Sequence, residues 1–293
     1  MEFLRSENTN FSREWALNIR GKLFTISTPQ VMGIVNCTPD SFYASSRKSS
    51  IDSQKSLIDL HVENGATWLD IGGYSTRPGA EHISETDEIE RIKQAVSYAL
   101  EKYSTVKISV DTFQSEVANY VLEQGVHLIN DISGGLINEE LFSIIASHEV
   151  PYVLMHMRGT PQNMTQLNSY ENMLQEILIE LGIQVEKARK AGIKDIIIDP
   201  GFGFAKNSEQ NLELFSRLEA FQLFDSPILI GISRKSLISK TLGIDSFDSL
   251  NGTTVLNTLA LEKGANILRV HDVKEAVETV KLWSKIKGIP SPE

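Results

Sequence analysis

Polar side chains stand where short apolar runs of the sequence stop, and their types suit binding of a small polar ligand. The eight endings are Asn36, Asp70, Asp111, Asn130-Asp131, His156, Asp199, Ser233-Arg234-Lys235 and Arg269-Val270-His271. Any one ending is typical of a turn or a helix cap. Eight in the same position indicate a shared site, because burying so many polar groups is costly unless a ligand or paired charges satisfy them.

The basic endings predict an anion site. Arg269 and His271 are two residues apart on a predicted strand, so they point to the same side. Ser233 to Ser236 follows another run and can open a helix, whose N–H groups suit phosphate. The chain as a whole has a net charge of −10, which argues against broad nucleic-acid binding and makes a local basic site necessary for an anionic substrate. The alternative is that Arg234 and Lys235 are solvated surface residues.

The acidic and amide endings favour a heterocycle. Asp111, Asn130 and Asp199 can together satisfy several N–H donors and carbonyl acceptors of an amino-pyrimidinone ring. A carboxylate pairs with a guanidine-like edge through two parallel hydrogen bonds. The alternative is that all three residues cap their own loops. Phe202 and Phe204 follow Asp199 and either form an apolar wall for an aromatic substrate or pack under their loop.

The elements that must position these residues alternate between apolar runs and amphipathic stretches. The runs begin near Val31, Thr67, Lys107, His127, Pro151, Asp195, Pro227 and Asn266. Each run is apolar throughout, as in parallel strands that are buried on both faces. The pattern predicts an α/β protein with a single (β/α)₈ TIM barrel, in which all carboxyl ends of the strands meet at one face. A doubly wound sheet is the competing fold, but no GxGxxG follows the first strand.

The first 30 residues stand apart from the repeat. The sequence predicts an N-terminal extension and a hairpin in residues 1–30, turning at Gly21, and a barrel domain in residues 31–293. We expect the hairpin to close the bottom of the barrel, and residues 1–13 have no assigned role. Predicted helices include one that Ser84 and Asp87 cap, and three over 170–191, 250–263 and 273–286.

Composition limits the class of protein. Apolar residues make up 41% and charged residues 23% of 293 residues, which is ordinary for a globular chain. We expect no membrane span, since no apolar run approaches the roughly 20 residues that a span needs. We expect no signal peptide, since Met1 to Glu7 lacks the order of basic and then apolar residues that is typical of one. The single cysteine, Cys37, excludes an internal disulfide and favours the cytoplasm.

Six motifs in order resemble those of the dihydropteroate synthases in the pterin-binding family. The motifs are Met32-Gly33-Ile34-Val35-Asn36 running into Thr38-Pro39-Asp40-Ser41-Phe42, Asp70-Ile71-Gly72-Gly73 running into Ser75-Thr76-Arg77-Pro78-Gly79, Met155-His156-Met157-Arg158-Gly159-Thr160-Pro161, Asp199-Pro200-Gly201-Phe202-Gly203-Phe204, Ser233-Arg234-Lys235-Ser236 and Arg269-Val270-His271. The resemblance covers nearly the whole chain, from Val31 to Ile286. One departure is that no glycine follows Phe42 in the stretch Tyr43 to Lys48.

The resemblance implies a transferase of folate biosynthesis. It would condense 6-hydroxymethyl-7,8-dihydropterin diphosphate with p-aminobenzoate and release 7,8-dihydropteroate and diphosphate, and sulfonamides would bind in its p-aminobenzoate pocket. The implied roles are pterin binding by Asp111, Asn130, Asp199 and Lys235; diphosphate binding by Thr76, Arg77, Arg269 and His271; a p-aminobenzoate pocket of Phe42, Pro78, Phe204 and Ser236; and Mg²⁺ ligation by Asn36. We expect an SN1-like route in which Asp111 and Asp40 stabilise the pterin cation, with Lys235, Arg269 and His271 as the other catalytic residues.

Two further expectations concern partners and rival functions. The resemblance suggests a homodimer through the last helices, where Leu256, Leu259, Leu282, Trp283 and Ile286 either form the interface or pack against the barrel. One rival function is a methyltransferase barrel acting on methyltetrahydrofolate, which would share the pterin contacts without needing the basic endings. Another is a catalytically silent pterin-binding protein, against which the full set of polar residues argues.

Overall fold

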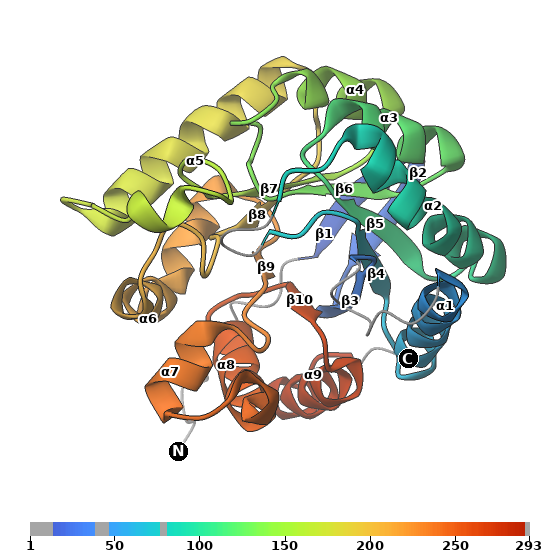
Figure 1. Ribbon diagram of the computed structural model, residues 1–293. Coiled ribbons are helices and arrows are strands. Elements are labelled where there is room, and N and C mark those ends of the chain that lie inside the picture. The colour runs from blue at the N-terminus through green and yellow to red at the C-terminus, as the bar shows by residue number, and fades with distance from the viewer. Residues whose placement is uncertain (1–13, 39–46, 77–80, 291–293) are drawn as a thin grey trace.

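The structure is a computed structural model that describes residues 14–38, 47–76 and 81–290, and a ring of eight parallel strands lies at its centre (Figure 1). The strands are β3 (Gln30–Asn36), β4 (Trp68–Gly72), β5 (Lys107–Asp111), β6 (Leu128–Asp131), β7 (Tyr152–Met155), β8 (Ile196–Asp199), β9 (Leu229–Ile230) and β10 (Ile267–Val270). Their order is β8-β7-β6-β5-β4-β3-β10-β9, and a parallel bridge between Ile198 and Ile228 joins the two ends. The predicted (β/α)₈ barrel is therefore confirmed.

Helices occupy the connections and surround the strands (Figure 1). The α-helices are α1 (Arg47–Glu63), α2 (Glu85–Lys102), α3 (Ser115–Gln124), α4 (Glu140–His148), α5 (Met173–Lys190), α6 (Ser208–Ser216), α7 (Ser236–Leu242), α8 (Leu250–Glu262) and α9 (Val273–Lys287). Short 3₁₀ segments lie at Met164–Gln166, Leu218–Phe224 and Ser246–Asp248. Within the described ranges, none of these helices combines the length and apolar character needed to cross a membrane.

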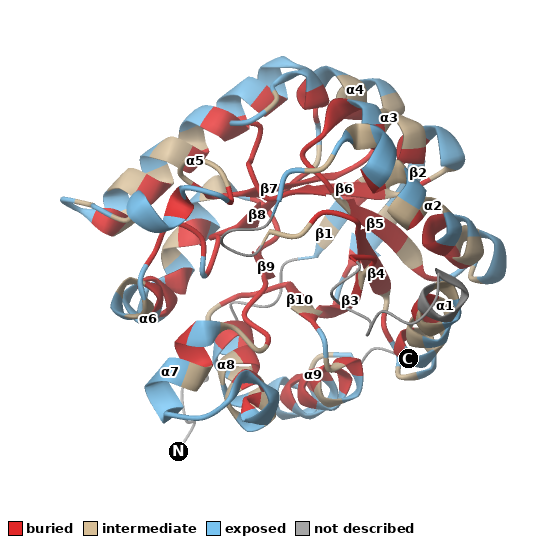
Figure 2. Cartoon of the chain, in the orientation of Figure 1, coloured by how far each residue is buried: buried red, intermediate tan, exposed pale blue. Residues whose placement is uncertain are grey.

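Two layers of apolar side chains hold the barrel together, one inside the ring and one between the ring and its helices. Figure 2 shows the eight barrel strands almost uniformly buried and the helices buried mainly on their inner faces. Alternate residues of a strand face opposite sides. On β10, Ile267 packs inside the barrel while Leu268 and Val270 join the outer core. Arg269 therefore points inward, as the sequence predicted.

A two-stranded hairpin closes the bottom of the barrel. Strand β1 (Trp15–Ile19) pairs with β2 (Lys22–Ile26), and the turn places Arg20 at φ 53° and Gly21 at φ 77°. Positive φ at both central residues gives a turn whose twist matches that of the strands. The hairpin contributes Leu17, Ile19 and Ile26 to the same inner cluster as Met32 and Trp68. This confirms the predicted hairpin and its place under the barrel.

Helix boundaries follow local capping chemistry. The Oγ atom of Ser84 accepts the N–H of Asp87 at 3.1 Å, which confirms the predicted start of α2. Helix α5 begins at Met173 rather than at the predicted Tyr170, because the side chain of Asn172 accepts the N–H of Gln175 and caps the first turn. Helices α8 and α9 begin where predicted, and each differs from its predicted end by one residue. Residues 1–13 and the loop over 39–46 lie outside the described residues.

Candidate functional site

A buried carboxylate, Asp70, joins four strands at the carboxyl-end mouth of the barrel. Its Oδ1 accepts the hydroxyl of Ser109 on β5 at 2.6 Å. Its Oδ2 accepts Nδ2 of Asn130 on β6 at 2.9 Å and Nε of Arg269 on β10 at 2.5 Å. Parallel pairing fixes this arrangement, since Asp70 stands level with Ser109, and Asp111 stands level with Asn130. The sequence marked Asp70 as a strand ending but gave it no role.

Arg269 bridges two carboxylates at this mouth. Besides Asp70, its Nη2 donates to Oδ2 of Asp111 at 2.7 Å. Burial raises the pKa of Asp111 to about 7, and the guanidinium of Arg269 opposes that rise. Burial works to lower the pKa of Arg269, but Asp70 and Asp111 raise it above its usual range. Asp111 and Arg269 therefore present a carboxylate and a permanent cation side by side at the mouth.

Asp199 and Lys235 form the second charged group. Both Asp199 and Arg269 approach Gly231, so that a Cβ there would lie 4.0 Å from Oδ2 of Asp199 and 4.0 Å from Cδ of Arg269. The two charged groups thus share one mouth. Burial raises the pKa of Asp199, which Lys235 opposes, and burial lowers the pKa of Lys235 to about 8. The ammonium of Lys235 donates to the carbonyl of Phe202 and lies 4.8 Å from the ring centre of Phe204.

The rim after β9 and β10 is tied together by Ser233 and His271. The hydroxyl of Ser233 lies 3.1 Å from Nδ1 of His271 and accepts the backbone N–H of His271 at 3.2 Å. Burial and the nearby guanidinium of Arg269 lower the pKa of His271. Arg234 turns to Asp272, with Nε and Nη2 at 2.8 and 2.7 Å from its two oxygens. Of the basic residues at this ending, Lys235 and not Arg234 faces Asp199.

The remaining predicted site residues are placed unevenly. Asn36 is the last residue of β3 and pairs in register with Gly72 of β4, which in turn pairs with Asp111 of β5. Asn36 is four residues after Met32, whose side chain packs inside the barrel, so alternation points Asn36 inward as well. Thr76 follows β4 and is half-buried, and Ser236 begins α7 with an exposed side chain. Four predicted residues lie outside the described residues: Asp40, Phe42, Arg77 and Pro78.

Two residues of these endings, Asp131 and His156, turn away from the mouth, although Asn130 beside Asp131 faces it. Asp131 accepts the N–H groups of Ser133 and Gly135 and the hydroxyl of Tyr152, at 2.7, 2.8 and 2.6 Å. It therefore caps its own loop, the alternative that the sequence left open. His156 faces α5 instead of the barrel axis. Each is one residue past the last inward position of its strand, so alternation sends it outward.

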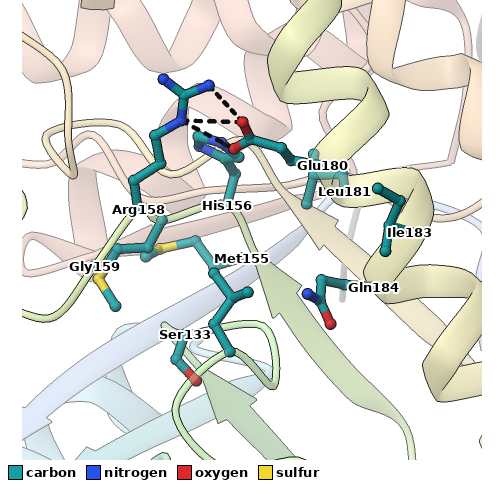
Figure 3. A pocket seen from close by; sticks show the side chains of 11 residues that line it. Ser133, Met155, His156, Arg158, Gly159, Glu180, Leu181, Ile183 and Gln184 are labelled. Carbon is teal, nitrogen blue, oxygen red and sulfur yellow. Dashed lines mark hydrogen bonds and ion pairs between the residues drawn. The ribbon is translucent and has the colours of Figure 1, made fainter. Parts of the chain in front are cut away.

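A second cluster lies behind the mouth, between the loop after β7 and α5, and the sequence did not predict it (Figure 3). Nε2 of His156 is 3.0 Å from Oε2 of Glu180, and Nε of Arg158 donates to both oxygens of Glu180 at 3.0 and 3.1 Å. These residues line one end of a cavity of about 310 Å³ whose opposite wall includes Gln184. Nζ of the buried Lys206 lies 2.9 Å from Nδ1 of His156, the ring nitrogen that does not face Glu180. No spacing or motif in the sequence connects Lys206 with this cluster.

Metal ligands are sparse in this site. No group of three or more His, Cys, Asp or Glu residues able to hold a metal ion occurs in the described part of the chain. The side-chain oxygen of Asn36 is an oxygen ligand of the kind Mg²⁺ prefers. A single ligand suits an ion that keeps its waters and binds substrate phosphate, rather than one held permanently by the protein.

Comparison with known proteins gives consistent matches. The model of a family described as pterin binding enzyme matches residues 32–271. Dihydropteroate synthase of Escherichia coli strain K12 is 37% identical over 265 residues, which cover 90% of this chain and 93% of that enzyme. Dihydropteroate synthase of Yersinia pestis, solved with a sulfonamide drug complex, superposes with a TM-score of 0.87 at 36% sequence identity. The match covers 94% of this chain and 100% of that chain. The structure of the Xanthomonas albilineans enzyme with 4-aminobenzoic acid superposes with a TM-score of 0.86 at 33% sequence identity. The match covers 95% of this chain and 100% of that chain.

Proposed function

Because the chain belongs to the family of pterin-binding enzymes, we propose how its barrel mouth carries out the reaction of the dihydropteroate synthases. The chain is a transferase of folate synthesis, which condenses 6-hydroxymethyl-7,8-dihydropterin diphosphate with p-aminobenzoate and releases diphosphate. The observation that carries the residue assignment is the meeting of an acidic group, Asp111 with Asn130, and a charged pair, Asp199 with Lys235, around Arg269 at one mouth.

The pterin ring is proposed to lie between these two groups. Nδ2 of Asn130 is used by Asp70, which leaves Oδ1 to accept an N–H of the ring. Oδ1 of Asp199 accepts the backbone N–H of Gly201 at 2.7 Å, so Oδ2, which approaches Gly231, can pair with the aminopyrimidine edge. Lys235 supplies a donor for the ring carbonyl, and Asp111 accepts on the other side.

The diphosphate is proposed to bind at the rim beside the pterin. Nε and Nη2 of Arg269 donate to the carboxylates of Asp70 and Asp111, and Nη1 can donate to phosphate oxygens. Thr76 and His271 stand on the neighbouring loops, and Arg77 belongs to the same proposed contacts, although it lies outside the described residues. A cation already fixed by two carboxylates costs little reorganisation when a second anion arrives.

Mg²⁺ is proposed to bind with the diphosphate through Asn36. The donor type fits, since Asn36 would offer one amide oxygen to an ion that otherwise binds water and phosphate oxygens. When bound, the ion neutralises charge on the leaving diphosphate. The part played by this chain is to hold one ligand in place at the end of β3 and to set Arg269 and His271 beside the leaving group.

We propose that diphosphate leaves before the amine attacks. Departure leaves positive charge on the pterin methylene and ring, which the carboxylate of Asp111 stabilises, as would Asp40 on the loop outside the described residues. Aniline nitrogen is a weak nucleophile, which favours this order. A large secondary deuterium isotope effect at the methylene supports it, whereas a value near unity would contradict it.

The p-aminobenzoate is proposed to lie above the ring of Phe204, with Ser236 on its other side. Phe204 is buried, and its ring is held beneath Lys235. Phe42 and Pro78 would complete the pocket from the two loops that lie outside the described residues. The relative from Xanthomonas albilineans was solved with 4-aminobenzoic acid, which supports a pocket of this kind.

A homodimer and a cytoplasmic location are also proposed. Among the five apolar residues predicted for the interface, Leu259, Leu282 and Ile286 are exposed, at 44%, 69% and 81%. Trp283 is instead buried, and its Nε1 donates to Glu262 at 2.7 Å. The exposed three give α8 and α9 an apolar surface suited to a second copy of this chain. The cytoplasmic location stays a prediction, supported by relatives that act in folate synthesis.

The experiment that tests the function is a diphosphate-release assay with the purified chain. Release should require both the pterin diphosphate and p-aminobenzoate, and a chelator should abolish it until Mg²⁺ is added back. Absence of release with Mg²⁺ and both substrates would refute the synthase activity. Release that persists in excess chelator would refute only the metal proposal.

A further inference from the structure

A buried ammonium lies behind the loop that follows β8, outside all the contacts proposed for the substrates. Nζ of Lys206 donates to the carbonyls of Gly201 and Phe204 at 2.9 and 3.0 Å, and lies 2.9 Å from Nδ1 of His156. An ammonium has three N–H donors, so each has one acceptor here. We call this set of contacts the Lys206 clamp.

The clamp is held in place from α5. Because Nε2 of His156 faces the carboxylate of Glu180 at 3.0 Å, the ring proton is assigned to Nε2 and Nδ1 accepts from Lys206. Burial lowers the pKa of His156 to about 4, which keeps the ring a neutral acceptor. Arg158 fixes Glu180 in turn, as Figure 3 shows. The acceptor of Lys206 therefore has a fixed position and a fixed tautomer.

The loop held by the clamp contacts Asp199 and Lys235, the two charged groups proposed to bind the pterin, on its other side. Gly201 donates its N–H to Oδ1 of Asp199 at 2.7 Å, while its carbonyl is held by Lys206. The carbonyl of Phe202 accepts a hydrogen bond from the ammonium of Lys235. Nζ of Lys235 also lies 4.8 Å from the ring centre of Phe204. A movement of this loop would displace Asp199 and Lys235 together.

The backbone of this loop is closely packed around the two carbonyls that Lys206 holds. Gly201 has φ +73°, and a Cβ there would lie only 2.0 Å from the carbonyl oxygen of His156. Gly203 donates its N–H to Oδ1 of Asn211 at 2.7 Å, and Nδ2 of Asn211 donates back to the carbonyl of Lys206 at 3.2 Å. The loop is thus packed against His156, one residue past β7, and its far end is held by Asn211.

Stability alone does not account for a lysine in this position. Burial lowers the pKa of Lys206 to about 7, against the attraction of Asp199. The charged and titratable groups that face it are Asp199, Lys235, Glu180, Arg158 and His156. Burying an ammonium costs free energy that its hydrogen bonds must offset. A methionine would fill the same space, but it would not hold the two carbonyls.

We propose that Lys206 is a positioning residue for pterin binding, which fixes the loop over 201–204 so that Asp199 and Lys235 meet the ring in a preorganised geometry. This inference rests on the proposed function, because it assumes that these two residues bind the pterin. Preorganisation of a site raises affinity by removing the cost of ordering it on binding.

The test is direct titration of 6-hydroxymethylpterin, followed by its fluorescence, in a double-mutant cycle of Lys206→Met and Lys235→Met. Lys206→Met should weaken binding roughly 10-fold, about the loss of one hydrogen bond. In the Lys235→Met background the same change should weaken binding much less, because the two act through one loop. Lys263→Met, which removes a surface pair with Glu219, should leave the Kd unchanged.

The outcomes separate this proposal from the function itself. An unchanged Kd in Lys206→Met, or a loss that simply adds to that of Lys235→Met, would overturn the positioning role. Failure of the wild-type chain to bind the pterin would overturn the proposed function instead. If Lys206→Met does not fold by thermal melting, Lys206→Gln, which keeps one donor group, takes its place in the same cycle and is judged by the same two outcomes.

Discussion

Replacing Arg269 by lysine probes the link between the acidic group, Asp111 with Asn130, and the proposed diphosphate site. The guanidinium contacts Asp70 at 2.5 Å and Asp111 at 2.7 Å through two different nitrogens. A lysine ammonium is a compact point charge that cannot reproduce this fork. Since Asp70 is fully buried and Asp111 is more exposed, the shorter side chain should keep Asp70 and release Asp111.

The expected loss follows from one charge-assisted hydrogen bond. Such a bond contributes about 1.5–3 kcal/mol, so kcat/KM for the pterin diphosphate should fall roughly 10- to 100-fold. The pH profile should change as well. Arg269 opposes the burial that raises the pKa of Asp111 to about 7. Without that contact the pKa rises further, so more of Asp111 is protonated at neutral pH and the acidic limb of kcat/KM moves to higher pH.

The assay is diphosphate release measured from pH 5 to 9, with Arg20→Lys as the matched control. Arg20 also holds two partners, the carbonyls of Leu122 and Val126, but it lies in the hairpin at the closed end of the barrel. Its substitution can lower thermal stability and should leave the pH profile unchanged. Wild-type kcat/KM and an unshifted acidic limb in Arg269→Lys would refute the proposed coupling between Arg269 and Asp111.

Three further predictions test the rest of the site. Asp199→Asn should weaken binding of 6-hydroxymethylpterin at least roughly 10-fold, because a neutral amide loses the charge-assisted pair; equal affinity by fluorescence titration would place the ring elsewhere. Asn36→Ala should raise the Mg²⁺ concentration for half-maximal diphosphate release while KM for p-aminobenzoate stays the same, and an unchanged Mg²⁺ requirement would remove Asn36 as a ligand. Leu282→Glu should shift the chain towards monomer in sedimentation analysis, since it places a charge on an exposed apolar surface; an unchanged mass would count against the interface on α9.

Much of the fold could be predicted because its signals are local. Each strand is a short run in which apolar residues predominate, and burial on both faces is what a parallel strand in a barrel requires. The turn at Gly21 and the cap at Ser84 depend on residues within a few positions of each other. The family motifs are likewise contiguous, which is why the residues that end the strands could be assigned in order along the chain.

Contacts between distant strands could not be predicted in the same way. Asp70 and Arg269 are 199 positions apart, and Lys206 and His156 are 50 apart, so no periodicity connects either pair. The sequence placed Asp70 and His156 at strand ends without stating which way each faces. Closure of the barrel decided it, because the register of neighbouring strands brings Asp70 level with Ser109 inside the ring and sends His156 outward to Glu180.

The sequence by itself therefore determined the strands, the hairpin and the residue types available at the mouth. Only the tertiary structure decided which carboxylates share Arg269. It also decided which lysine faces Asp199 at the mouth and which is buried behind the loop. The physical reason is that pairing a buried charge depends on distance through space, and chain closure sets that distance far more than spacing along the chain.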